Sequence, residues 1–214
     1  MAHYKYDRHN FDPQFKLHLC CGNDDIRPVF QYIHFIGGYA YATDAHVLIR
    51  AKIADISDFT EEEIAMLNNK SISGRLFRQL IQRRSVEVTP EGFVWNDESG
   101  DIAQTFKFHN IDDDRKMNLY KMQESFKIPN MDAIIDDTFT TQPTPQIGIK
   151  VECFEWITRA MGCEILAMYF KGDNKGIMVR PAFTLHEPTL DIVGVIMPCL
   201  LDMQQEYVRT IPKE

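Results

Sequence analysis

The sequence contains no apolar stretch that would hold it in a membrane or direct its export. No run reaches roughly eighteen apolar residues, the length that a transmembrane helix requires. Its beginning, MAHYKYDRHNFDPQF, includes no apolar segment of signal-peptide length. We therefore expect no association with membranes and predict a cytoplasmic protein.

The motifs of metalloproteins and nucleotide-binding enzymes are also missing. The histidines show no H-E-x-x-H spacing, and neither G-x-x-x-x-G-K-[ST] nor G-x-G-x-x-G occurs. We therefore predict no metal site and no bound cofactor. The cysteines form no C-x-x-C pair, so we expect buried free thiols. They are Cys20, Cys21, Cys153, Cys163 and Cys199.

Charge limits the partners that the chain can bind. Of its 214 residues, 44% are hydrophobic and 25% are charged, a balance that is typical of a globular protein. The formal net charge of −8 disfavours indiscriminate binding to polyanions, because phosphates must meet Lys or Arg side chains. Any contact with DNA is therefore expected to be local.

Several segments have the alternation and the β-branched or aromatic content of strands. Residues 15–21 fit one strand. Residues 29–53 fit two or three antiparallel strands, with Gly37 and Gly38 as a two-residue hairpin turn. Three more short strands are expected at 85–90, 91–97 and 103–108.

Two segments before residue 86 have helical patterns. Residues 60–69 fit a short helix within an acidic connector, because Thr60 followed by Glu63 resembles a capping box. Residues 71–85 fit an amphipathic helix with an apolar and a basic face. The apolar face would be formed by Leu76, Phe77, Leu80 and Ile81, and the basic one by Arg75, Arg78, Gln79 and Gln82.

The order of elements repeats along the chain. Residues 110–146 are polar, and we interpret them as a long connector with some strand character. Residues 146–183 then repeat the order of short strand, amphipathic helix and strand hairpin, with Ile149 at the position of Ile72. A last strand is expected at 191–201. The repetition predicts an α+β fold with antiparallel sheets and helices on one face.

Residues 42–48, with the sequence ATDAHVL, resemble the ATDGHRL segment of the bacterial sliding clamp, the beta subunit of DNA polymerase III. Further likenesses follow in the same order. They are a basic helix after a connector, an FKIP segment at 126–129 that resembles the family's inter-domain FPDY region, and a VIMP segment at 195–198 that resembles its closing VVMP. The resemblance covers roughly residues 15–201 and implies a DNA-clamp-like fold and a binding protein that is not an enzyme.

In that family each domain pairs two halves, the sheets form the outside of a ring, and the helices line a channel around duplex DNA. The resemblance divides this chain at the polar connector. Residues 1–110 would form one clamp-like domain and 111–146 a connector with the reduced first half of a second domain. Residues 147–201 would form its second half, and 202–214 a C-terminal tail. A homo-oligomer is implied, but one and a half domains leave ring closure open.

The two end motifs carry the family's peptide-docking pocket, into which partner proteins insert a short hydrophobic motif. Carried over by position, the pocket would use Thr43, Ala45, His46, Val47 and Leu48, with Val195, Ile196, Met197, Pro198, Cys199 and Leu200 opposite. Ala45 replaces a glycine of the family, and Val47 and Leu200 stand where arginine is common. We therefore expect a more apolar pocket than is usual for sliding clamps.

The resemblance assigns DNA contact to the basic helix. Between residues 70 and 84 five cations occur without a single acid, namely Lys70, Arg75, Arg78, Arg83 and Arg84. Such a face can meet the phosphates of duplex DNA through non-specific, salt-sensitive contacts. A merely solvated face is the alternative, and Arg83 and Arg84 could instead offset the helix dipole.

Two other functions stay open. A reduced clamp relative could bind proteins only, or serve as a decoy, without any affinity for DNA. A small hydrolase that uses Asp44 and His46 is the alternative from a different class of protein. However, residues two apart in a strand share a face and readily form a structural hydrogen bond, and no nucleophile accompanies this pair. We therefore predict no catalytic residues.

Overall fold

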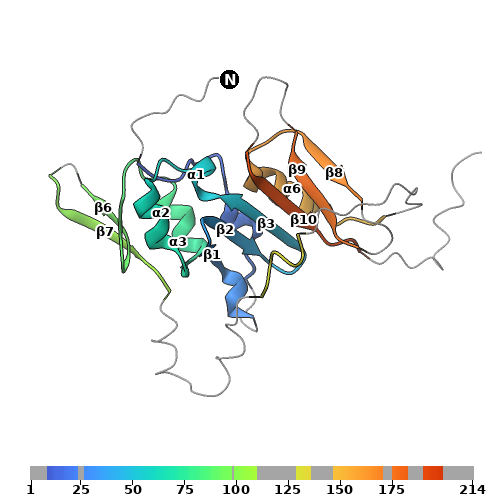
Figure 1. Ribbon diagram of the computed structural model, residues 1–214, viewed down its shortest axis with the longest axis horizontal. Coiled ribbons are helices and arrows are strands. Elements are labelled where there is room, and N and C mark those ends of the chain that lie inside the picture. The colour runs from blue at the N-terminus through green and yellow to red at the C-terminus, as the bar shows by residue number, and fades with distance from the viewer. Residues whose placement is uncertain are drawn as a thin grey trace, which may run out of the picture.

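The structure is a computed structural model that describes residues 9–23, 27–97, 99–109, 129–135, 147–170, 175–182 and 190–199. Its centre is a seven-stranded antiparallel sheet (Figure 1). In spatial order its strands are β4 (Lys70–Ser73), β1 (Tyr32–Ile36), β2 (Tyr39–Thr43), β3 (Val47–Lys52), β10 (Ile192–Ile196), β9 (Ile177–Pro181) and β8 (Leu166–Tyr169). A second sheet consists of β5 (Glu87–Thr89), β6 (Gly92–Asn96) and β7 (Ile102–Lys107). The predicted α+β class is therefore confirmed.

The helices are short, and the longest of them lies behind the sheet in Figure 1. They are the 3-10 helices η1 (Leu17–Cys20) and η2 (Pro28–Gln31) and the α-helices α1 (Ile53–Ile56), α2 (Glu61–Leu67), α3 (Gly74–Leu80) and α6 (Val151–Met161). Helix η1 contacts both α3 and α6, and α6 also contacts β3 and β10. These three helices form one layer against the sheet. Within the described residues no helix is both long and apolar enough to cross a membrane.

The meander of β1, β2 and β3 confirms the prediction for residues 29–53. Gly37 and Gly38 have φ angles of 58° and 82°, the left-handed values that a two-residue hairpin turn needs. The register then sets Thr43 of β2 opposite Leu48 of β3. The loop between these strands, residues 44–46, consequently lies at one end of the sheet.

A cluster of phenylalanine rings joins the two sheets. The ring of Phe11 stacks on Phe35 of β1 and lies edge-on to Phe93 of β6, with centroid distances of 5.9 Å in both cases. Phe59 and Phe77 complete the cluster around Phe11, each at 5.0 Å. All five rings are buried. The hydrophobic core therefore runs from the large sheet through α3 to the small one.

Helix α6 packs closely on the large sheet because β10 contains a glycine. A Cβ atom at Gly194 would lie 2.4 Å from Cδ1 of Ile157 and 2.6 Å from Cε of Met161. Both of these helix side chains are buried. The helix ends at Gly162, whose φ of 62° is the left-handed value typical of a helix end. The absence of a side chain at Gly194 therefore sets how near α6 can approach.

The strand predicted at 15–21 is wrong, because this segment contains helix η1. Leu17 and Cys20 are buried, whereas His18 and Leu19 between them are partly exposed. Burial therefore follows the three-residue repeat of a 3-10 helix, which a short apolar stretch does not distinguish from strand alternation. The helix lies between α3 and α6.

The basic helix predicted at 71–85 is shorter than expected. Residues 70–73 are β4, which pairs with β1, and α3 begins where the hydroxyl of Ser73 accepts a hydrogen bond from the amide of Leu76 at 3.2 Å. The last turn is capped from a distant part of the chain. The side-chain amide of Asn10 donates to the carbonyl oxygens of Leu80 at 2.8 Å and Arg83 at 3.0 Å. Phe77, Leu80 and Ile81 are buried as predicted, but Leu76 only partly.

The remaining short elements follow the predicted order. The capping box of α2 is present, with Glu63 N donating to Thr60 Oγ1 and Thr60 N donating to Glu63 Oε2. Strands β5, β6 and β7 occupy the three predicted positions, and α6, β8, β9 and β10 follow in the predicted sequence. The short strand predicted before α6 is wrong, because the described residues there form only an isolated bridge between Gly148 and Cys199. Most of the predicted connector, 110–146, lies outside the described residues, as does the tail at 202–214. Strands from both sides of this connector share the large sheet.

Candidate functional site

The two end motifs lie side by side on adjacent strands. Strand β10 pairs with β3 so that Val195 faces Leu48 and Ile196 faces Val47. The pairing extends into the loop, where the amide of Met197 donates to the carbonyl oxygen of His46 at 2.8 Å. Strands β3 and β10 are therefore joined up to the edge at which the β2–β3 loop projects.

The conformation of that loop follows from its own sequence. The Asp44 carboxylate accepts hydrogen bonds from the amides of His46 and Val47, both at 2.8 Å. The Thr43 hydroxyl donates to the carbonyl of Val47 at 2.7 Å and accepts from the amide of Ala45 at 3.1 Å. Ala45 has a φ of 76°, a left-handed value that usually requires glycine. Asp44 thus shapes the backbone, which gives no support to its use as a catalytic acid or base.

A cavity of about 290 Å³ opens beside this loop. Strands β2, β3 and β10 contribute one side of it, and two other parts of the chain contribute the rest. Its lining consists of Phe30, Thr43, Ala45, His46, Val47, Leu48, Pro129, Met131, Ile134, Val195 and Met197. Only Thr43 and His46 have polar side chains. The cavity is therefore suited to an apolar group from a ligand.

Of the predicted pocket residues, seven line this cavity and one points away from it. Ile196 is fully buried on the face of the sheet that carries Gly194 and α6, because successive side chains of a strand alternate between faces. Pro198 and Cys199 follow β10 without lining the cavity. Cys199 instead pairs with Gly148 in an isolated bridge. Leu200 lies outside the described residues.

Sequence comparison by position missed the far wall of the cavity. Residues 129–135, which follow the FKIP resemblance, cross the outer face of the sheet and contribute Pro129, Met131 and Ile134. Met131 is buried in a small cluster with Tyr41, Leu48 and Val195. Pro129 alone had a signal in the sequence, since it ends the FKIP segment. Phe30 had none.

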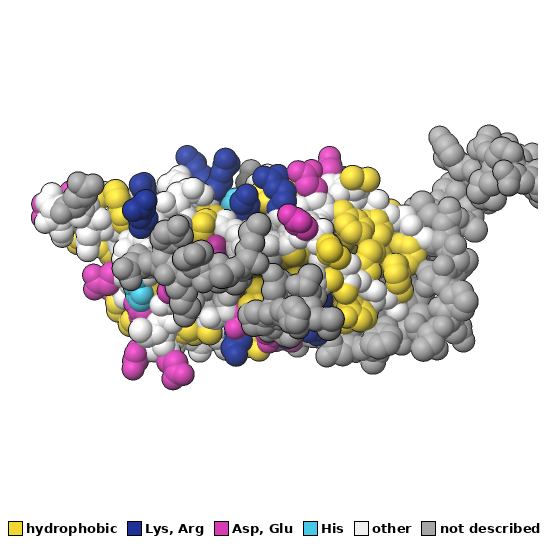
Figure 2. Space-filling view, turned by 90° about the horizontal axis from the view of Figure 1, so that it is seen from above, with side chains coloured by type: hydrophobic (Ala, Val, Ile, Leu, Met, Phe, Trp, Pro, Cys, Tyr) yellow, Lys and Arg dark blue, Asp and Glu magenta, His cyan; other side chains and the backbone are white. Residues whose placement is uncertain are grey.

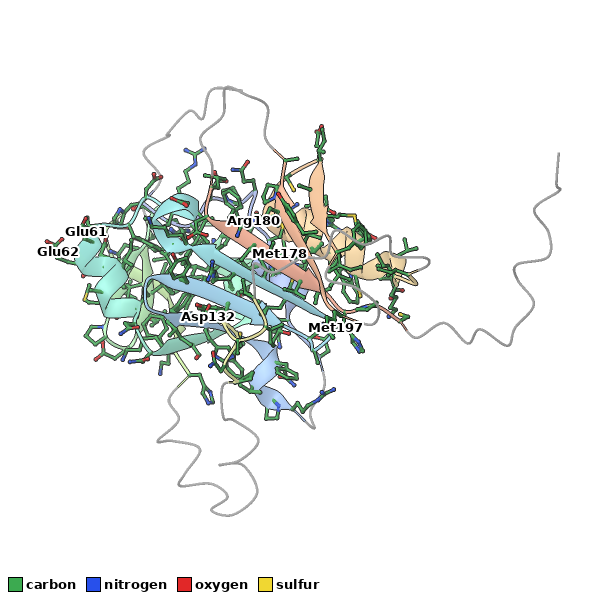
Figure 3. All side chains as sticks on the ribbon, turned by 45° about the vertical axis from the view of Figure 1, so that its right-hand side comes forward. Glu61, Glu62, Asp132, Met178, Arg180 and Met197 are labelled. Atoms are coloured by element: carbon green, nitrogen blue, oxygen red, sulfur yellow. The ribbon has the colours of Figure 1, made fainter. Side chains whose placement is uncertain are left out.

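A carboxylate fixes this wall to the sheet. Asp132 accepts hydrogen bonds from the Tyr41 hydroxyl at 2.9 and 3.0 Å and from Nη1 of Arg50 at 3.2 Å. The same guanidinium lies 3.5 Å from Asp191, which also accepts a bond of 2.7 Å from the Tyr39 hydroxyl. Burial and the bond to Asp132 together raise the pKa of Tyr41 to about 12. Figure 3 shows Asp132 over the strands of the sheet and Met197 toward their end.

The five predicted DNA-binding cations do not share one helix face. Arg75 and Arg78 are exposed on α3, whereas Lys70 belongs to β4 and holds its ammonium 5.9 Å from the centroid of Phe108. Arg83 lies beyond the helix, over the ring of Trp95 at 4.2 Å, and donates to Gln104 at 2.9 Å. Arg84 follows in the loop and is exposed. The placement of Lys70, Arg83 and Arg84 on the helix is therefore wrong.

Other cations stand near α3 that the sequence did not single out. Burial and, to a smaller extent, the nearby positive charges of Arg78, Lys16 and Arg159 together lower the pKa of His18 in η1 to about 4. These cations come from α3, from the residue before η1 and from α6. On α6, Arg159 is paired with Glu155 at 3.0 Å, so its charge is partly offset. Figure 2 shows Lys and Arg side chains gathered along one edge of the face of the molecule that it displays.

Among the described residues, no group of His, Cys, Asp and Glu side chains could hold a metal ion. The cysteines described are free, and burial raises the pKa values of Cys20, Cys21, Cys153 and Cys163. Cys20 and Cys153 are buried as expected, whereas Cys21 and Cys163 are only partly buried and Cys199 is exposed.

No protein-family model matches the sequence, and no curated protein matches it. Solved structures of bacterial sliding clamps are similar in fold. The beta subunit of DNA polymerase III from Pseudomonas aeruginosa aligns over 88% of this chain and 65% of its own length, with a TM-score of 0.52 and 12% identity. The beta chain from Streptococcus pneumoniae aligns over 87% and 62%, with a TM-score of 0.53 and 13% identity.

A Pseudomonas aeruginosa sliding clamp bound to griselimycin aligns over 88% of this chain and 64% of its own length, with a TM-score of 0.51 and 10% identity. This chain therefore spans less than two thirds of the length of these clamps. At such low identity the likeness concerns the fold alone. The predicted sliding-clamp fold is confirmed.

Proposed function

We propose that the protein is a clamp-like accessory protein, not an enzyme, that tethers a replication or repair partner by docking a short hydrophobic peptide. The observation that carries this proposal is the apolar cavity between the β2–β3 loop, β10 and residues 129–135. Sliding clamps share the fold, and one of them binds griselimycin. Tethering raises the local concentration of a partner without any covalent chemistry.

Equilibrium binding of a labelled peptide tests the docking. The probe is a fluorescein-labelled hexapeptide with leucine and phenylalanine anchors, followed by fluorescence anisotropy, and the control replaces both anchors with serine. We expect saturable binding with a Kd below about 100 µM, which corresponds to about −5.5 kcal/mol. Griselimycin serves as a competitor of the labelled hexapeptide that is unrelated to its sequence. Equal affinity for the anchored and the serine peptides would end the proposal.

We further propose that the helix layer associates with duplex DNA. Arg75 and Arg78 are exposed on α3, and the charges of Arg78, Lys16 and Arg159 all act on His18. A few cations of this kind support weak, non-specific contact with phosphates. The net charge of −8 favours the second candidate, a protein-binding module without DNA affinity.

The salt dependence of DNA binding separates these two candidates. At low salt, the Arg75→Glu/Arg78→Glu variant should bind a labelled duplex much more weakly than the wild type does. The slope of log K against log salt should be smaller in magnitude by about two units than that of the wild type. Lys52→Glu, which reverses one charge where the variant reverses two, is the control, since Lys52 is exposed at the end of β3. A wild type without affinity at low salt would favour the protein-binding module.

The exposed edge of the large sheet supports the proposed homo-oligomer. Among the described strands, β8 pairs with β9 at one end of the large sheet, its residues are all partly exposed, and neither it nor the flanking Ile165 and Phe170 carries a charge. Ile165 is 63% exposed and Phe170 37%. Figure 2 shows hydrophobic side chains gathered at the end opposite the β6–β7 hairpin, where Figure 1 places β8. A strand at the end of a sheet can pair with a strand of another chain.

Light scattering after gel filtration measures this assembly. The Ala167→Lys substitution places a charge in β8 and should reduce the mass toward that of one chain. Ile102→Lys, on the edge strand β7, is the control, because Ile102 is 69% exposed and belongs to the small sheet. A wild type of single-chain mass at every concentration would exclude this oligomer.

A further inference from the structure

We infer that the Asp132 carboxylate is a positioning group that holds the wall of the peptide pocket in its binding-competent place. The inference rests on the proposed docking function and concerns how the pocket is kept formed. Residues 129–135 supply three of the lining side chains, including the buried Met131. Whatever seats this segment on the sheet therefore also sets the shape of the cavity.

The segment has few bonds of its own to the sheet. Its backbone hydrogen bonds are internal, from the amide of Ile134 to Met131 and from that of Ile135 to Asp132, and the amide of Ala133 donates to the side chain of Asn130. Between this segment and the described strands, every hydrogen bond ends on the Asp132 carboxylate. Within the part of the chain that the structure describes, one side chain therefore carries the polar attachment of this wall to the sheet.

The partners of Asp132 are themselves held in place. Tyr41 is buried in β2, where its ring packs in the same cluster as Met131. Arg50 in β3 stacks over the Tyr39 ring at 4.8 Å and lies near Asp191, the residue before β10. The amide of Asp191 in turn donates to Asp55 at 2.8 Å. Asp132 thus meets donors that are already fixed by β2, β3 and the start of β10.

Seating of the wall and occupation of the pocket are consequently linked. Met131 and Ile134 reach the cavity only when the segment lies on the sheet, and a docked apolar group gives them a further contact. A ligand that binds only when residues 129–135 lie on the sheet has an apparent affinity that is proportional to the fraction of molecules in which they do so. The same ligand must stabilise the seated segment to an equal extent.

Three variants separate this role from general damage to the fold. Asp132→Ala removes the attachment, and Asp132→Asn keeps an acceptor for the Tyr41 hydroxyl but loses the charge opposite Arg50. Asp191→Ala is the matched control, because it removes another carboxylate from the same guanidinium without touching the wall. Hydrogen exchange of residues 129–135 and the Kd of the leucine–phenylalanine hexapeptide are measured for each.

We expect Asp132→Ala to weaken peptide binding by roughly fivefold and to speed exchange in 129–135, with Asp132→Asn intermediate. Asp191→Ala should have the smallest effect, because it leaves both bonds of Asp132 in place. The Tyr41→Phe change should add little to Asp132→Ala, since both break the same bond. Equal exchange in Asp132→Ala and wild type would overturn the inference. That measurement needs no peptide, so it stays decisive even if the wild type binds none and the docking proposal fails.

Discussion

Truncation of Met197 offers the clearest single test of the pocket. Its side chain lines the cavity and is 42% exposed in the free protein. Full burial of a methionine side chain contributes about 1.5–3 kcal/mol, so a docked peptide that covers the exposed share gains about 0.6–1.3 kcal/mol from it. At 1.4 kcal/mol per tenfold, Met197→Ala should weaken hexapeptide binding by about three- to eightfold.

A second methionine of similar exposure provides the control. Met66 on α2 is 39% exposed and does not line the cavity. Both alanine variants lose a comparable buried share of side chain, so each should lower the free energy of unfolding by about 1–2 kcal/mol. Only Met197→Ala should change the Kd in the anisotropy titration. The reasoning is refuted if the two variants bind the peptide equally well.

Three further predictions concern the fold that supports the site. Gly194→Ala should destabilise the protein by about 1–3 kcal/mol in urea unfolding, since its new Cβ would collide with Ile157 and Met161; unchanged stability would mean that α6 does not pack there. Thr60→Ala should cost about 1 kcal/mol by loss of the capping box, whereas a neutral result in the same assay would contradict the cap. Burial lowers the pKa of His34 to about 4, below the usual 6.5 that it regains on unfolding, so the unfolded chain binds its proton first. Stability should therefore fall as the pH drops from about 6.5 toward 4, and urea unfolding of His34→Gln should show a shallower fall; an identical pH dependence would contradict this role.

The conformation of the β2–β3 loop depends on neighbouring residues, whereas its place beside β10 was expected from the resemblance to sliding clamps alone. The side chains of Thr43 and Asp44 bond to the backbone of the next three residues, so the sequence of this loop determines its shape. The glycine pair at 37–38 fixes the preceding hairpin in the same way. Such local bonds leave a recognisable pattern in the sequence.

The parts that could not be predicted depend on contacts between distant residues. Asn10 closes the end of α3 from 70 positions away in the chain, and Trp95 holds Arg83 away from the predicted basic face. The wall at 129–135 likewise depends on Tyr41 and Arg50, which are separated from Asp132 by 91 and 82 positions. Periodicity and propensity contain no record of these pairs, and η1 shows that they can also mislead over a short apolar stretch.

Photo-crosslinking tests most directly whether a peptide occupies the cavity. A hexapeptide whose aromatic anchor is benzoylphenylalanine is irradiated with the protein, and the linked residues are identified by mass spectrometry. Met131 and Met197 both line the cavity and would lie beside the anchor. The account predicts crosslinks within 129–135 and 195–199 that the unlabelled leucine–phenylalanine peptide suppresses. Crosslinks confined to other surfaces, or unaffected by that competitor, would contradict it.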